Sequence, residues 1–367
     1  MSSVLIIKPL GPARLASLPI LGLEVLGAQK VLGIPLPSTV LGLMGHLLNI
    51  RLKQDQVEKD PLLGIGALID RISARNEKYN SVIQGPVICV SLHAGSFNDS
   101  SESVCKTVRE QVFTVPIFTK EGVKLVRWDA VKDLGRVSDE EALIIPEDAV
   151  IGWAVSRTEV GVALRDSIMR SWSRVVMPGY TFRKSFVQYV NRHGRSLEVE
   201  FVYKLTVESS LQKTIARLGG EGRQAIVEVK NLSREREVTE IIRRITSPLE
   251  ARPGDYLVLN YWPLIPRNKN TLYLERDRII GLEFFDNPSE DIIGIPRIAN
   301  STGSPTIYIV RLGLGFSEVV KQRRSQILAL PPGTLIKVKH PFSEVRNQIV
   351  KAYVELLRAG YGSLLRI

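Results

Sequence analysis

The sequence predicts an α+β protein with two domains, residues 1–179 and 180–367. A chain of 367 residues exceeds one average domain, and 44% hydrophobic residues can bury a substantial core. Segments with the period-two alternation of strands are interspersed with two apolar segments of helical period. The alternation becomes clearer from Tyr180 onward, which places the boundary between the domains at that point.

The N-terminal half begins with a short buried strand, because Val4–Ile7 is an uninterrupted apolar run. A loop interrupted by Pro and Gly follows. A helix is expected over Ser38–Asn49, with the hydroxyl of its first residue as the cap. Val87–Leu92 is a further strand candidate. We interpret residues 76–146 as strands and loops inserted into this domain.

Two alternating segments, Phe182–Val190 and Leu197–Val207, predict a strand pair that faces a core. The turn between them, Asn191–Arg195, contains the Gly and the polar residues that a hairpin needs. A helix is then expected over Ser209–Leu218, and Gln224–Lys230 alternates as a strand. The order strand, strand, helix, strand is most of a ferredoxin-like unit.

The rest of the C-terminal half predicts a charged helix, three strands and a final amphipathic helix, in chain order Ser233–Ile245, Tyr256–Leu259, Thr306–Val310, Thr334–Val338 and Ser343–Arg358. The segment Gly360-Tyr361-Gly362 ends the last helix. The predicted fold class is therefore α+β with inserted loops and strands, and most of a ferredoxin-like unit lies in the C-terminal half.

The charge is distributed unevenly along the chain. The net charge is +11, of which residues 1–180 carry +1 and residues 181–367 carry +10. This excess favours nucleic acid or an anionic membrane surface as partner. The segment Val31–Ile50 contains no Asp, Glu, Lys or Arg, but it has two prolines near its start and several polar residues, so we expect no membrane helix there.

Cys89 and Cys105 are the only cysteines, which excludes a disulfide framework and a thiolate zinc cluster. A reducing cytoplasm suits this composition, and the N-terminus lacks the pattern of a secretory signal. The four histidines are scattered without metal-ligand spacing, so neither a metal site nor another cofactor is expected. No Walker loop, nucleophile elbow or zinc-protease motif is present.

The turn Leu218-Gly219-Gly220-Glu221-Gly222-Arg223 is the clearest candidate site. Its backbone amides are unhindered by side chains and can hold phosphate oxygens, while Arg223 and the preceding Arg217 supply positive charge. A helix-ending glycine in a tight loop explains the same residues equally well.

Arg183 and Lys184 are accompanied by aromatic residues that could stack on unpaired bases. Alternation places the two basic side chains on opposite faces of the strand, so core use of the aromatic residues is favoured. The run Lys321–Arg324 is interpreted as a solvated loop. His46 is expected to be a core residue of its helix, although a single histidine can act as a general base in RNA cleavage.

Several short motifs, taken together, resemble the CRISPR-associated RAMP superfamily, and specifically the Cmr-type (type III-B) subunit that is similar to the Cas-five group. They occur in the family's order over most of the chain: Pro35–Gly42, Arg157–Leu164 with Pro178-Gly179-Tyr180, Leu218–Arg223, Leu314–Ser317, Leu330–Thr334 and Gly360–Gly362. Residues 76–146 match no block of the family.

The resemblance implies two ferredoxin-like folds at the base of a ribonucleoprotein effector. There the subunit grips the repeat-derived 5′ tag of the guide RNA (crRNA), beside the large polymerase-like subunit and the backbone RAMP subunits. We therefore expect a non-catalytic RNA-binding protein whose contacts are Ser38, Thr39, Arg183, Lys184, Arg217, Gly219, Gly220, Arg223, Gly360, Tyr361 and Gly362.

Two alternatives remain open at this point. The first is a metal-independent RAMP endoribonuclease that processes CRISPR repeat RNA through His46 or His193. The second is a basic module of a membrane surface or a ribosome, suggested by the apolar segment Val31–Ile50.

Overall fold

The computed structural model describes residues 3–13, 15, 32–73, 80–93, 109–132, 134, 143–165, 175–207, 211–219, 223–231, 236–267, 275–299 and 305–367. These residues form a mixed helix and strand structure, which confirms the α+β class. That each half is ferredoxin-like stays a prediction.

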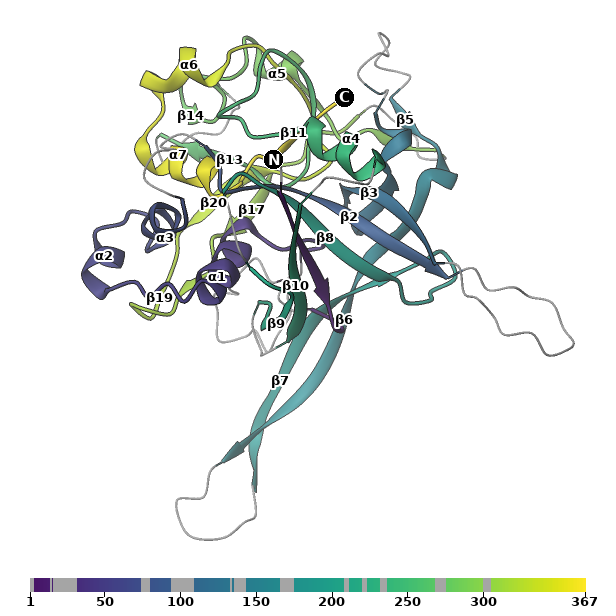
Figure 1. Ribbon diagram of the computed structural model, residues 1–367, viewed down its shortest axis with the longest axis vertical. Helices are drawn as coiled ribbons and strands as arrows, with labels where there is room; N and C mark the ends of the chain where they lie inside the picture. The colour runs from purple at the N-terminus through teal and green to yellow at the C-terminus, as the bar shows by residue number, and fades with distance from the viewer. Residues whose placement is uncertain are drawn as a thin grey trace, which may run out of the picture.

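A nine-stranded antiparallel sheet dominates the fold (Figure 1). Its strand order is β7-β6-β4-β3-β2-β8-β1-β10-β9. The strands are β1 (Ser3–Pro9), β2 (Ile83–His93), β3 (Arg109–Thr119), β4 (Gly122–Arg127), β6 (Val150–Arg165), β7 (Val175–Val190), β8 (Glu198–Leu205), β9 (Thr214–Arg217) and β10 (Gln224–Asn231). The 16-residue strands β6 and β7 extend from the body as a two-stranded ribbon (Figure 1).

The strands of this sheet come from both predicted halves of the chain. β1 lies between β8 and β10, with Leu5 paired to Tyr203 on one side and to Val229 on the other. A boundary between residues 179 and 180 falls inside β7. The sheet therefore does not follow the predicted division into residues 1–179 and 180–367.

The C-terminal part of the chain adds two smaller sheets, and two strand pairs complete the described strands. The five-stranded sheet has the order β11 (Ile245–Thr246), β22 (Leu364–Arg366), β12 (Gly254–Val258), β21 (Leu335–Val338), β15 (Ile292–Gly294). The four-stranded sheet has the order β14 (Ile279–Ile280), β13 (Trp262–Pro266), β20 (Gln326–Leu330), β17 (Val310–Gly313). The two pairs are β5 (Ile144–Ile145) with β16 (Arg297–Ile298), and β18 (Phe316–Ser317) with β19 (Gln322–Arg323).

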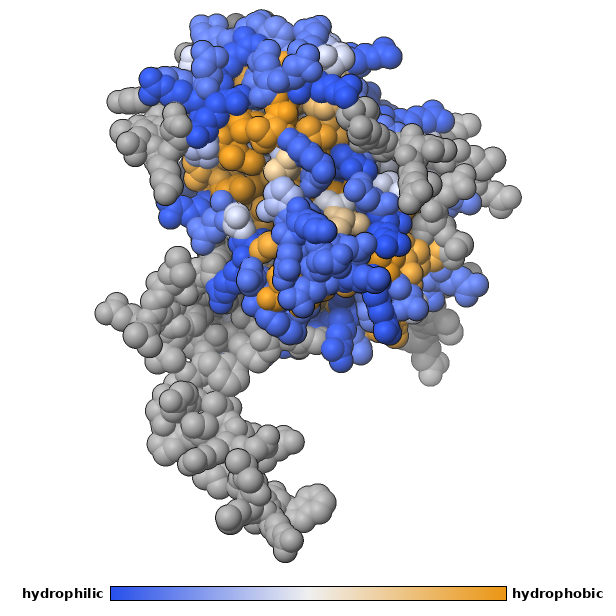
Figure 2. All heavy atoms as spheres, turned by 90° about the vertical axis from the view of Figure 1, so that its left-hand side faces the viewer, coloured by the Kyte–Doolittle hydropathy of each residue, from blue (hydrophilic) through white to orange (hydrophobic). Residues whose placement is uncertain are grey.

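Seven α-helices occur in the described residues: α1 (Pro37–Leu47), α2 (Gln54–Glu58), α3 (Ile65–Ile72), α4 (Arg236–Arg244), α5 (Pro288–Asp291), α6 (Phe342–Val345) and α7 (Lys351–Arg358). α1, α2 and α3 lie together on one side of the molecule, near β19 (Figure 1). On that side an apolar patch is bordered by polar side chains (Figure 2). A second core surrounds Trp262, whose ring packs edge-on against Phe284 with centroids 5.2 Å apart.

Three predicted elements and one predicted strand pairing differ from the structure. The described part of the predicted helix Ser209–Leu218 contains the strand β9, because Thr214–Arg217 pairs with β10 at the edge of the large sheet. The turn Asn191–Arg195 is confirmed, since Asn191 Oδ1 accepts from the amides of His193 and Arg195. Next to the turn, Val190 makes an antiparallel bridge with Ser196. Beyond this bridge the two strands diverge, because β7 pairs with β6 while β8 pairs with β1 and β2.

The last predicted helix is interrupted. Ile349 and Val350 adopt extended backbone angles between α6 and α7, and the buried Ile349 packs into the core around Trp262. The predicted strand Thr306–Val310 also differs: the chain makes an isolated bridge at Thr306, and β17 begins only at Val310.

Candidate RNA-binding groove

Helix α1 begins at a proline rather than behind a serine cap. Leu36 is the residue before the helix, and Pro37 occupies the first helical position, where its missing N–H costs nothing. Ser38 therefore lies inside the first turn and caps no amide. Its hydroxyl instead accepts a hydrogen bond from Tyr361 (3.1 Å). Burial raises the pKa of Tyr361 to about 12, which keeps this donor protonated.

The glycine turn is the loop of the β9–β10 hairpin. The amide of Leu218 donates to the carbonyl of Arg223 (2.8 Å), which closes the loop. Gly219 has φ +69°, so the expected left-handed glycine is present, at a hairpin instead of a helix end. Arg217, at the end of β9, is exposed. Gly220 lies outside the described residues.

The motif Leu314–Ser317 leads into the β18–β19 hairpin. Gly315 has φ +92°, and the following Phe316 is a large apolar side chain that is 44% exposed. Arg324 fixes the position of this hairpin: its Nη1 donates to the carbonyl of Phe316 (2.7 Å) and its Nε to the carbonyls of Leu62 and Leu63. The expectation of a solvated loop at Lys321–Arg324 is therefore wrong for Arg324, whose pKa burial lowers.

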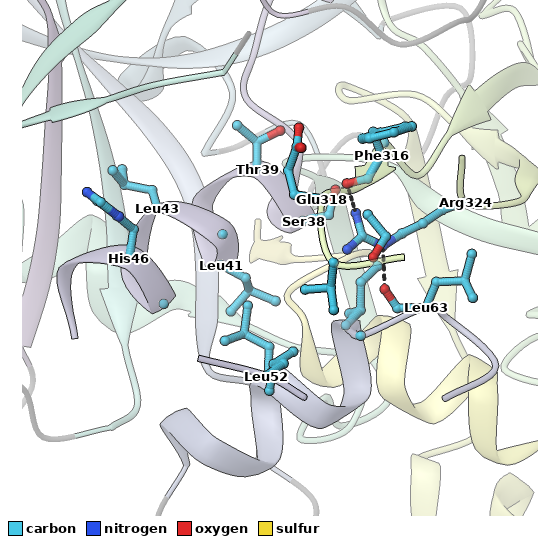
Figure 3. A pocket seen from close by; sticks show the side chains of 18 of the residues that line it. Ser38, Thr39, Leu41, Leu43, His46, Leu52, Leu63, Phe316, Glu318 and Arg324 are labelled. Carbon is cyan, nitrogen blue, oxygen red and sulfur yellow. Dashed lines mark hydrogen bonds between the residues drawn. The ribbon is translucent and has the colours of Figure 1, made fainter. Parts of the chain in front are cut away.

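These three segments line one groove of about 590 Å³ (Figure 3). The start of α1 contributes Ser38 and Thr39, and the β9–β10 hairpin contributes Arg217 and Gly219. The Leu314–Val319 segment forms a further wall, and its Phe316 lies on the same side as Thr39 and Ser38 (Figure 3). The structure thus brings together four of the predicted contacts from segments far apart in the sequence.

The groove combines an apolar floor with a cationic margin. Leucine and isoleucine side chains of α1, α3 and the intervening chain form the floor, among them Leu41, Leu52 and Ile65. Among the described residues Arg217 has no carboxylate partner, so its charge is available to a ligand. Glu318 is the acidic residue of the lining, and it forms an ion pair with Lys321 (2.9 Å).

Other predicted contacts lie outside this groove. Arg223 pairs with Glu159 (3.1 Å) and stacks over the ring of Phe186 at 4.2 Å, where the β6–β7 ribbon leaves the body. Arg183 and Lys184 belong to β7, with backbones paired to Val160 and Glu159 of β6. Their side chains lie outside the described part of the structure.

Gly360 and Gly362 have a structural role in the described geometry. The amide of Gly360 donates to Leu357 O (3.0 Å), and that of Gly362 donates to Tyr261 O (2.9 Å) and to Asn260 Oδ1 (3.0 Å). Both glycines are buried, so these amides are already used within the chain. The segment contributes to the groove through Tyr361, which holds Ser38.

Reasoning from the sequence missed Phe316 and Arg324 as groove residues. Phe316 stands in one of the motifs, and its signal was a large apolar residue between a glycine and a basic run. For Arg324 no local signal existed, because its acceptors on Leu62 and Leu63 lie more than 250 positions away in the sequence.

His46 is exposed at the groove margin, so the expectation of a core histidine is wrong. It lies away from Ser38, Thr39 and Phe316 (Figure 3). Among the described residues, no group of three or more His, Cys, Asp or Glu side chains is arranged to hold a metal ion. In the same part of the chain, no helix is both long and apolar enough for a membrane crossing.

No protein-family model and no curated protein matches this sequence. Several chains of solved structures match its fold, among them the following two. One is a chain of the type III-B Cmr-beta bound to cognate target RNA, with a TM-score of 0.59 and 18% identity over 99% of this chain and 96% of that chain. The other is Cmr-beta bound to cognate target RNA and AMPPnP, with a TM-score of 0.59 and 18% identity over 98% and 95%.

The chain has the fold of a type III-B Cmr-beta chain. The likeness covers nearly all of both chains, and it confirms the resemblance to Cmr-type proteins that the motifs carried. At 18% identity the shared property is the fold.

Proposed function

We propose that this protein is a non-catalytic subunit of a Cmr-type (type III-B) effector and that its groove holds the 5′ tag of the guide RNA. The protein then contains two RAMP-type, ferredoxin-like domains, although the large sheet shares strands from both halves of the chain. Its partners are the large polymerase-like subunit and the backbone RAMP subunits. The likeness to chains of Cmr-beta structures bound to target RNA supports this proposal.

One observation carries the assignment to RNA: an exposed aromatic ring and an exposed, unpaired arginine line the same groove. Phe316 offers a face on which an unpaired base stacks, and Arg217 offers charge to the adjoining phosphate. The hydroxyls of Ser38 and Thr39 lie at the same margin and can bond a ribose or base edge. A groove of 590 Å³ has the size of known small-ligand sites, which suits a nucleotide.

The net charge of +10 in residues 181–367 supports binding beyond one groove. Arg183 and Lys184 lie on β7, and Lys184 is the register partner of Glu159, which pairs with Arg223. Neither Arg183 nor Lys184 is among the described residues that line the groove. We assign them to phosphates outside the groove. Arg223 holds the base of this ribbon through Glu159 and Phe186, so it acts by positioning.

The test is a binding titration with tagged guide RNA and a tag-scrambled RNA of equal length. The wild type binds the tagged RNA more tightly. Arg217→Ala weakens binding about fivefold and lowers the salt slope by about 1, as expected for one phosphate contact. Phe316→Ala weakens it by about fivefold to a hundredfold, the range for one stacked base. Arg195→Ala, an exposed arginine of the 191–195 turn, is the matched control and leaves binding unchanged.

Equal affinity for the tagged and scrambled RNA contradicts the tag assignment. Equal losses in Arg217→Ala and Arg195→Ala contradict the groove as the site. Folding of each variant is checked by its thermal unfolding midpoint, because Arg217, Phe316 and Arg195 are exposed and their loss is expected to change stability little.

A metal-independent endoribonuclease is the second candidate function. His46 is exposed at the groove margin, which makes it a better candidate for the general base than His193 in the remote turn. An imidazole there could take a proton from a ribose 2′-hydroxyl. Repeat RNA incubated with the protein in EDTA decides between the two functions. If cleavage persists in EDTA and is lost in His46→Ala, the protein is an endoribonuclease and our proposal is wrong. If the RNA stays intact, the result supports the binding function.

A further inference from the structure

A segment of five residues, Thr306–Val310, has the composition of a strand without the pairing of one. Its residues are Thr, Ile, Tyr, Ile and Val, all β-branched or aromatic. Thr306 makes a bridge with Ile295, and Val310 pairs with Ala329. Between these points, the backbone N–H and C=O groups of residues 307–309 form no hydrogen bond within the described part of the chain.

The side chains of this segment alternate between core and solvent. Ile307 and Ile309 are 37% and 44% exposed, while the ring of Tyr308 packs against Phe118 with centroids 5.7 Å apart. The alternation continues into β17, where Arg311 is exposed and Leu312 is buried. Among the described residues Arg311 has no ion-pair partner. The outward face therefore presents two isoleucines and one free arginine in a row.

The position of the segment leaves it at the edge of a sheet. β17 is the outermost strand of the four-stranded sheet, paired on one side to β20. An exposed edge with apolar side chains is a template for another strand, and soluble proteins usually blunt such edges with charges, prolines or bulges. Residues 307–309 carry none of these features.

We propose that residues 307–311 form a docking edge for an extended segment of another polypeptide, which adds a strand beside β17. The unpaired backbone groups call for a partner with its own backbone donors and acceptors, which a strand provides. The cross-strand neighbours of Ile307 and Ile309 are then apolar, and a carboxylate lies opposite Arg311. The same chain continues directly into the Leu314–Val319 wall, so the added strand reaches the groove.

The inference rests on the proposed function, since the donor of the strand is a fellow subunit of the effector. Its test is amide hydrogen exchange, measured on two samples. One is the isolated protein, which carries an affinity tag, and the other is the complex that is purified with it from its source cells. In the isolated protein the amides of residues 307–309 exchange rapidly. In the complex they become protected by about tenfold or more, as expected for a newly paired strand.

Two variants test the backbone hydrogen bonds and the apolar contacts of the added strand one at a time. Ile309→Pro removes one N–H donor, and Ile307→Asp with Ile309→Asp removes the apolar contacts. Both are expected to lose the protection and the partner subunit. Val350→Asp is the matched control, because Val350 is 45% exposed between α6 and α7, and it retains both. Binding of tagged RNA by the isolated variants shows that they are folded.

A photo-crosslinking residue at position 307 identifies the occupant. A crosslink to a segment of another subunit supports the proposal. A crosslink to RNA, to a second copy of the chain or to the chain itself overturns it, as does rapid exchange of residues 307–309 inside an assembled complex. The proposed function fails separately, when the tagged and scrambled RNAs bind equally.

Discussion

Asn260→Ala is expected to be among the most destabilising single substitutions in the protein. Asn260 is 1% exposed, and its Nδ2 donates to the carbonyls of Gly85 (2.6 Å) and Gly360 (2.8 Å). Its Oδ1 accepts from the amide of Gly362 (3.0 Å). The side chain therefore ties the bulge of β2 to the turn that follows α7.

The three hydrogen bonds of Asn260 differ in what replaces them when they are lost, and this determines the expected change in the free energy of unfolding. The carbonyl of Gly360 keeps the hydroxyl of Ser363 (2.7 Å), and the amide of Gly362 keeps the carbonyl of Tyr261 (2.9 Å). Gly85 lies in the register shift between Gln84 and Val87, where it has no paired residue in β8. The variant thus leaves one buried carbonyl without its side-chain donor and weakens two shared bonds. We expect a loss of about 3–4 kcal/mol in the free energy of unfolding.

The assay is equilibrium denaturation in guanidinium chloride, followed by circular dichroism, with Asn347→Ala as control. Asn347 is exposed, so its variant is expected within about 0.5 kcal/mol of the wild type. A loss in Asn260→Ala of less than about 1 kcal/mol refutes the reasoning, because one unpaired buried carbonyl alone costs that much. The variant is also expected to bind tagged RNA more weakly, since Tyr361, which holds Ser38, lies within the released turn.

Three further substitutions test the structure in the same way. Burial, with Asp60 and Asp70 nearby, raises the pKa of Glu355, so above the unfolded pKa its charged form destabilises the fold. Glu355→Gln should therefore raise the free energy of unfolding by about 1 kcal/mol at neutral pH. In denaturant titrations over a pH series, this gain should vanish as the pH falls towards about 4. Gly33→Ala should cost about 1–3 kcal/mol in thermal unfolding, because the added Cβ lies 2.4 Å from Cβ of Val123; no loss would show that the neighbouring strand yields. Arg324→Lys should weaken RNA binding severalfold because an ammonium group cannot replace the guanidinium that spans three carbonyls; wild-type affinity would contradict its positioning role.

The sequence predicts local geometry well where a residue type demands it. Gly219 and Gly315 both have the positive φ that favours glycine, and Asn191 organises its turn through its own carboxamide. Alternation likewise identifies β8 and β10 as strands with one buried face. These predictions succeed because neighbours in the chain determine the outcome.

Prediction fails where partners are distant. Alternation reports which face of β7 and β8 is buried, yet it says nothing of which strand lies beside each, and both pair elsewhere. The segment Thr214–Arg217 becomes a strand because the edge of β10 is available to it. Similarly, the buried position of Gly360 and Gly362 follows from Asn260, 100 or more positions away. Tertiary context overrides local propensity at each of these places.

The groove itself could not be derived from any one motif, because each motif supplies only part of the site. The turn at Gly219 places Arg217, the start of α1 places Ser38 and Thr39, and the turn at Gly315 places Phe316. None of these alone distinguishes a phosphate site from an ordinary turn. The site also depends on Arg324, which joins the Phe316 hairpin to the chain between α2 and α3. This arginine thereby fixes the relative position of two walls of the groove. Arg324 donates to three internal carbonyls, so among the described groove residues Arg217 is the arginine that is free for a ligand. Loss of Arg324 should therefore weaken RNA binding without altering its salt slope, whereas loss of Arg217 should alter both.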